Sequence, residues 1–122
     1  MSDNIITDFF AWWNGAMREP ALLTADGFAR FFAADATVIV NGNLRATGPE
    51  EIARHYAAIA ARLDEVAMVL PVEQAFAATD RAFVHCRTHV VNNGAVAAEE
   101  AMAYAIVVEG RITLFRVVSL SV

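Results

Sequence analysis

The chain has 122 residues, is 57% hydrophobic and carries a formal net charge of −5 at pH 7. The length suits one domain spanning residues 1–122, and the acidic balance makes nucleic acid a poor partner. All nine basic residues are arginine, which excludes lysine Schiff-base chemistry and lysine-dependent phosphate loops. A domain this small has little interior for so many apolar residues, so we expect some of them to be buried against a second subunit.

The expected location is the cytoplasm. The single cysteine, Cys86, cannot form an intrachain disulfide, which agrees with a reducing compartment. The N-terminus has acids where a secretory signal would carry basic residues, and no apolar run reaches membrane-spanning length. We therefore expect no membrane partner.

The N-terminal half is predicted to be mainly helical. Residues 2–4 can cap a helix that ends at Pro20, and its apolar positions recur at helical spacing: Ile6, Phe10, Trp13 and Met17. A second short helix is expected over 24–32. Residues 36–40 are rich in β-branched side chains and predict a strand that ends at an Asn-Gly turn.

A third helix is predicted from Thr47, with a proline and two glutamates in its first turn. Its apolar stripe is Ile52, Tyr56, Ile59 and Leu63, and His55 lies beside it. From Val66 onward, apolar segments are broken by turn residues at 79–80, 92–94 and 109–110, which predicts an antiparallel sheet. Pro71 implies an edge position or a bulge in the first of these strands.

Polar side chains alternate along the predicted strand 80–90. His85, Arg87 and His89 occupy every second position and share one face, because successive side chains on a strand point to opposite sides. Val84, Cys86, Thr88 and Val90 share the other face. The polar row is an ordinary solvated face if it meets water, and a binding or catalytic site if it lines a cavity.

The strand 99–108 separates large from small residues. Glu100, Met102, Tyr104, Ile106 and Val108 fall on one face, whereas Glu99, Ala101, Ala103, Ala105 and Val107 fall on the other. We expect the large residues to line a cavity. The alanine face, continued by Val84, Cys86 and Val90, would allow a second sheet to approach closely and predicts a homodimer through the outer sheet face.

The order of elements resembles the nuclear transport factor 2-like superfamily, and in particular its SnoaL-like branch. The resemblance covers roughly residues 5–120 and is carried by three segments: 31–38 (FFAADATV), 48–56 (GPEEIARHY) and 109–113 (EGRIT). It implies an α+β fold in which a cone-shaped, curved antiparallel sheet wraps around three helices from the N-terminal half. A pocket would lie inside the cone.

Ketosteroid isomerase, a member of this superfamily, supplies the overlay from which site residues are expected. Its general base falls on Val40, its protonated acid on Tyr104 and a pocket aromatic on His55. Its apolar wall positions fall on the polar row of His85, Arg87 and His89, which the resemblance therefore turns inward. The overlay adds Glu100, Met102, Ile106, Phe115, Val117 and Ser119 to the wall, and Trp13 could cover the pocket mouth.

Known reactions of the superfamily do not transfer to this sequence. Val40 cannot accept a proton, so steroid isomerisation lacks its base. The polyketide cyclases that the chain resembles use a late aspartate, but no acid follows Glu109 here. Arg87 without flanking acids reproduces only the centre of the Asp-Arg-Asp set found in limonene epoxide hydrolase-like members.

The candidate site residues also have ordinary structural interpretations. His85 and His89 lie about 13 Å apart along a strand, so they cannot share a metal unless His55 or Glu100 converges, and we expect neither metal nor cofactor. Arg87 could be paired structurally with Glu100, and Cys86 is expected to behave as a small apolar residue.

Two functional classes remain open for the small organic, polar or anionic ligand that the pocket is expected to hold. In the first, the protein is a cofactor-independent isomerase, cyclase or lyase. His55 or His85 would then be the general base, while Arg87 and Tyr104 stabilise negative charge. In the second, the same cavity belongs to a non-catalytic binding or dimerisation module.

Overall fold

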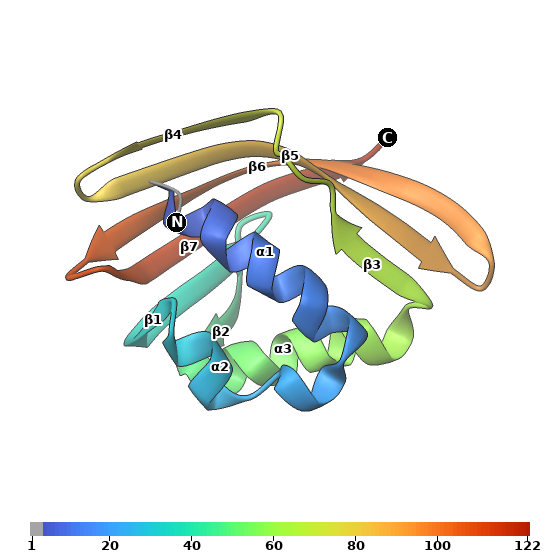
Figure 1. Ribbon diagram of the computed structural model, residues 1–122, viewed down its shortest axis with the longest axis horizontal. Helices are drawn as coiled ribbons and strands as arrows, with labels where there is room; N and C mark the ends of the chain where they lie inside the picture. Colours follow the sequence, from blue (N-terminus) through green and yellow to red (C-terminus); the bar gives the residue numbers. More distant parts are fainter. Residues whose placement is uncertain (1–3) are drawn as a thin grey trace.

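The computed structural model of the chain describes residues 4–122, which form three α-helices, one 3₁₀ turn and one seven-stranded sheet (Figure 1). The helices are α1 (Ile5–Arg18), α2 (Ala25–Ala29) and α3 (Gly48–Arg62), and the 3₁₀ turn is Pro20–Leu22. The strands are β1 (Phe32–Val40), β2 (Asn43–Thr47), β3 (Glu65–Met68), β4 (Gln74–Ala78), β5 (Arg81–Asn92), β6 (Ala95–Val108) and β7 (Arg111–Ser121).

The helices begin where the sequence predicts them. The Asn4 side chain accepts hydrogen bonds from the backbone N–H groups of Ile6 and Thr7, which satisfies two donors at the start of α1. Residues 2 and 3 of the predicted cap lie outside the described part. Pro49 stands in the first turn of α3, where its missing N–H removes no helical hydrogen bond.

The sheet has the order β2-β1-β7-β6-β5-β3, and β4 pairs with the other half of the β5 edge. Strands β5, β6 and β7 form an antiparallel meander joined by two tight turns. Asn93-Gly94 and Glu109-Gly110 both adopt positive φ, as such hairpin turns require. The α+β class is confirmed, and its predicted sheet is antiparallel except at one pair.

That exception is the pair of β1 and β7, which run parallel, so the sheet is mixed. Parallel pairing needs a long connection, and here residues 41–110 lie between the two strands. Two further details differ from the prediction: β1 begins at Phe32, and β2 was not predicted. Pro71 lies between β3 and β4, which both lie along the β5 edge of the sheet, so the predicted edge position holds and the predicted alternative of a bulge does not.

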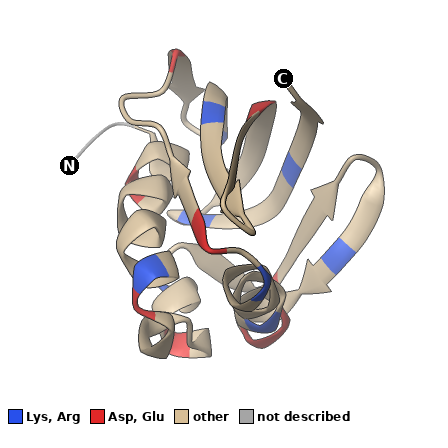
Figure 2. Cartoon of the chain, turned by 90° about the vertical axis from the view of Figure 1, so that its right-hand side faces the viewer, with Lys and Arg blue, Asp and Glu red and all other residues tan. Residues whose placement is uncertain are grey.

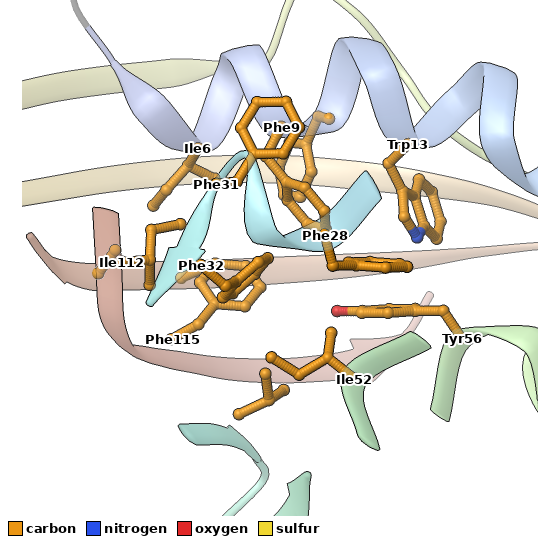
Figure 3. Packing of buried hydrophobic residues seen from close by; sticks show 14 of the residues in the cluster. Ile6, Phe9, Trp13, Phe28, Phe31, Phe32, Ile52, Tyr56, Ile112 and Phe115 are labelled. Carbon is orange, nitrogen blue, oxygen red and sulfur yellow. The ribbon is translucent and has the colours of Figure 1, made fainter. Parts of the chain in front are cut away.

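The core lies between the concave face of the sheet and the helices. α1 crosses this face and α3 runs below it (Figure 1). Aromatic rings fill the space between them, with Phe9 in edge contact with Phe32 at 5.1 Å and with Phe115 at 6.0 Å between ring centroids (Figure 3). Such contacts add to the free energy of apolar burial. Within residues 4–122, no helix is both long and apolar enough to cross a membrane.

Charged residues of both signs are interspersed over the helices and strands in the side view of Figure 2. No continuous band of one sign is visible on this side.

Candidate functional site

The two faces of the curved sheet have opposite surroundings. On β5, Val84 and Cys86 are buried, and on β6, Ala101, Ala103 and Ala105 are buried on the same side, beneath the helices. The residues between them therefore point to the outer, convex face. Met102 and Tyr104 confirm this direction, because 53% and 38% of their surfaces remain exposed.

The predicted direction of the polar row is therefore wrong. His85, Arg87 and His89 lie on the outer face, and so do Glu100, Met102, Tyr104 and Ile106; none of these seven residues lines the pocket. The alternation identifies correctly which residues share a face, but it contains no information on which face turns inward. A shift of one residue in an overlay exchanges the two faces completely.

The residues assigned to the dimer contact are wrong for the same reason. Ala101, Ala103, Ala105, Val84 and Cys86 are at most 6% exposed and pack against the helical layer or the pocket. Their small size leaves room for the protein's own helices and for a cavity. It does not make room for a second sheet.

An apolar pocket of about 760 Å³ opens between the concave sheet face, α1 and α3. This volume suits a small organic ligand. Trp13, Val40, His55, Phe115, Val117 and Ser119 line it, as the sequence predicted for their position. Further wall residues come from α1, α3 and β3: Phe9, Phe10, Tyr56, Ile59, Val66 and Met68.

A cationic edge of the pocket is formed by β2 and α3. The exposed side chains of Arg45 and Arg62 line the pocket together with the partly buried imidazole of His55. Burial lowers the pKa of His55 below its usual value of 6.5, and the positive charges of Arg45 and then Arg62 lower it further. His55 is therefore neutral at pH 7 and can accept a proton.

Other ionisable groups of the pocket differ in what they can do. Glu99 lines the pocket from β6, and among residues 4–122 its exposed carboxylate is the one acid in the lining. Burial raises the pKa of Cys86 to about 11, with the Glu73 carboxylate as a second cause, so this thiol stays protonated and unreactive at neutral pH. Burial also raises the pKa of Tyr56 far above its ordinary value, so its phenol stays a hydrogen-bond donor.

Trp13 lines the pocket, and its indole N–H is a buried donor. Trp13 is 6% exposed, and its Nε1 atom has no hydrogen-bond partner among the described residues. In Figure 3 the indole lies beside Tyr56, with which it makes an edge contact at 5.9 Å. A buried donor without an acceptor is costly, and such groups are uncommon in folded proteins.

The sequence did not lead us to predict that Arg45, Arg62, Glu99 and Tyr56 line the pocket. Arg45 belongs to β2, the strand that was not predicted. Arg62 is the last residue of α3, and in that helix we singled out the apolar stripe and His55 but not this arginine. Glu99 was assigned to the outer face together with the alanines. The available signal was the presence of an acid at the start of the small-residue face of β6.

Comparison with known proteins shows the fold. No family model matches the chain, and no curated protein does. A hypothetical protein from Catenulispora acidiphila DSM 44928 with a ketosteroid isomerase-like fold, solved with trimethylamine, is similar at a TM-score of 0.77 and 21% identity, over 96% of this chain and 85% of that chain. An NTF2-like protein of unknown function from Exiguobacterium sp. 255-15 is similar at 0.78 and 13%, over 96% and 98%.

A third similar structure is IdmH, a putative polyketide cyclase from Streptomyces antibioticus. Its TM-score is 0.70 and its identity is 15%, over 93% of this chain and 90% of that chain. Together these likenesses show that the chain has the NTF2-like fold that the sequence predicted. At these identities they carry no residue roles across.

Proposed function

We propose that this protein of NTF2-like fold binds a small molecule with an apolar body and an anionic oxygen. The observation that carries the proposal is the pair Arg45 and Arg62, placed beside a neutral His55 at the edge of an aromatic pocket. The apolar body would lie among rings such as Phe10 and Phe115. Guanidinium groups donate paired hydrogen bonds to carboxylates and similar anions.

The same arrangement supports acid–base catalysis without a cofactor. A neutral imidazole at His55 can remove a proton from a bound substrate, and the guanidinium groups of Arg45 and Arg62 can stabilise the negative oxygen that develops. Glu99 is a second group that can exchange protons. The reaction class that fits is an isomerisation, cyclisation or elimination that starts with proton transfer.

Trp13 supports a ligand with a hydrogen-bond acceptor. Its unpartnered indole N–H lies in the wall of the pocket, so a carbonyl or ether oxygen of a ligand could satisfy it after a small shift of the ring. This contact would orient the apolar body. The arginines at the cationic edge would hold the anionic group of the same ligand.

The test is calorimetric titration of aromatic and alicyclic carboxylates against the wild type, Arg45→Ala and Arg62→Ala. Each substitution should weaken binding roughly five- to tenfold, because a charged hydrogen bond in a partly solvated place is worth about 1–1.5 kcal/mol. Arg54→Ala is the matched control, since Arg54 is also an exposed arginine of α3 but pairs with Glu50 outside the pocket.

Trimethylammonium serves as the opposite probe, because trimethylamine is bound in the Catenulispora structure. The two arginines should repel this cation, so it should bind less tightly than a carboxylate of similar size. Carboxylate binding that is indifferent to both arginines, or preferred binding of the cation, would contradict the proposal.

A non-catalytic binding module remains the second candidate function, because no catalytic set known in the superfamily is present. His55→Gln distinguishes the two. In an enzyme this change should abolish turnover or solvent deuterium exchange of a bound ligand while its affinity changes little. In a binding module no ligand exchanges deuterium in the wild type.

We also infer a homodimer through the outer sheet face, with contact residues corrected from the structure. Met102, Val118 and Leu120 are 53–61% exposed there, and Met102 lies directly opposite Val118 on the neighbouring strand. Exposed apolar neighbours of this kind are typical of interfaces. Val118→Lys should give monomers in sedimentation velocity, and a monomeric wild type at micromolar concentration would refute the inference.

A further inference from the structure

Three metal-ligating side chains meet on the outer face of the sheet, away from the pocket. The His85 Nε2 atom lies 2.6 Å from a carboxylate oxygen of Glu100 and 3.2 Å from one of Glu73. All three ligand atoms lie within 4.8 Å of one another. One imidazole thus faces two carboxylates.

The sheet backbone fixes the three positions. Glu73 immediately precedes β4, and its backbone N–H donates to the His85 carbonyl at 2.9 Å. His85 lies opposite Met102, so Glu100 is its diagonal neighbour two residues along β6, within reach of a long side chain. Three adjacent segments therefore each contribute one ligand at the same level of the sheet.

We propose that Glu73, His85 and Glu100 form a binding site for a divalent first-row transition metal ion such as Zn²⁺. One imidazole nitrogen and two carboxylate oxygens are common zinc ligands, and the two carboxylates would neutralise the ion's charge. Ligand atoms around a tetrahedral zinc ion lie roughly 3.3–3.6 Å apart, given bonds of about 2.0–2.2 Å. The His85 to Glu100 distance must therefore open by only about 1 Å.

The surroundings predict an exchangeable ion. The side chains of Glu73 and Glu100 are 47% and 35% exposed, so water can complete the coordination sphere. Arg87 is the direct cross-strand partner of Glu100 and forms no ion pair within residues 4–122. Its positive charge disfavours a cation at the site, and its removal should strengthen metal binding.

The same strand offers a matched control. His89 lies on the same face of β5, but it faces a single carboxylate, that of Glu65, at 3.7 Å. It therefore lacks the second acid that completes the proposed site. His89→Ala removes a somewhat more exposed imidazole of the same strand face without touching the three ligands.

The experiment is titration of tag-free protein with Zn²⁺ by calorimetry and with Co²⁺ by visible absorption. The wild type should bind one ion per chain, with an increase in Co²⁺ absorption of the kind that four-coordinate sites give. His85→Ala, Glu73→Gln and Glu100→Gln should each weaken binding by at least about tenfold, since even the loss of an outer-shell partner has effects of that size. His89→Ala should bind as the wild type does, and Arg87→Gln should bind more tightly.

Circular dichroism of each variant checks that the fold is retained, and the near-isosteric Glu100→Gln keeps the test valid if His85→Ala does not fold. No saturable Co²⁺ or Zn²⁺ binding by the wild type would overturn the proposal. Equal losses in His89→Ala and His85→Ala would also overturn it. The three ligands come from one chain and lie outside the pocket, but His85 and Glu100 are cross-strand neighbours of the proposed dimer contacts Met102 and Leu120, so the titrations are repeated on Val118→Lys.

Discussion

Two neighbouring residues of β6 test which face of the sheet is the inside. Ala105 is fully buried, whereas Tyr104 is 38% exposed on the outer face. Ala105→Arg would bury an unpaired charge, which costs about 3–5 kcal/mol, and would overpack the core at a further cost of about 1–3 kcal/mol. A loss of at least about 4 kcal/mol is a large part of the 5–15 kcal/mol that stabilises a typical domain. Tyr104→Arg keeps its charge in water and should change the free energy of unfolding by less than about 1 kcal/mol.

The assay is urea unfolding followed by tryptophan fluorescence and circular dichroism. With a slope of about 1.5 kcal/mol per molar urea, the Ala105→Arg midpoint should fall by more than about 2.5 M, while that of Tyr104→Arg should shift by less than about 0.7 M. Repeating the measurement at two protein concentrations separates any effect on a dimer. If Tyr104→Arg destabilises the protein as much as Ala105→Arg does, the assignment of the faces is wrong.

Three other predictions follow from the pocket and the core. NMR titration should give His55 a pKa below 6.5, and Arg45→Ala should raise it. Because the unfolded chain then binds this proton more tightly than the folded one, stability should fall as pH drops below about 6.5, and an unshifted titration would contradict this. Trp13→Phe removes the unpartnered N–H together with part of a buried ring, so relief of the first should offset much of the packing loss from the second: the unfolding free energy should fall by less than about 1 kcal/mol while ligand affinity falls, and a loss as large as that of Phe115→Ala would contradict an unpartnered donor. Phe115→Ala should lower the unfolding free energy by about 3–5 kcal/mol, whereas Phe76→Ala, at a side chain 65% exposed, should lower it by less than about 1 kcal/mol; similar losses would refute the packing account.

The sequence predicted the helices and the hairpin turns because their signals are local. The Asn4 cap, the proline of α3 and the two X-Gly turns act through backbone geometry that neighbouring residues determine. Strand β2 has no such signal. It is five residues long, four of them exposed, and within the described part of the chain it pairs with β1 alone.

The candidate site could be predicted only in part. Trp13 was found on the apolar stripe of a predicted helix, and His55 and Val117 were found from the overlay. The inward direction of β5 could not be read from the sequence, because a row such as His85 and Arg87 has the same alternation whether it meets water or a cavity. Arg45 of β2 and Arg62 of α3 come together at the pocket because distant segments pack against each other, and no local sequence pattern predicts such packing.

The parallel pair of β1 and β7 has a consequence for how the molecule assembles. The β5, β6 and β7 meander needs only neighbouring contacts, whereas β1 must find the last strand of the chain, and such distant contacts form slowly. Val40 and Asn41, at the end of β1, line the pocket beside Val117 of β7. The pocket is therefore complete only after β1 and β7 have paired. A ligand that contacts residues of both strands should slow unfolding and leave the rate of early hairpin formation unchanged.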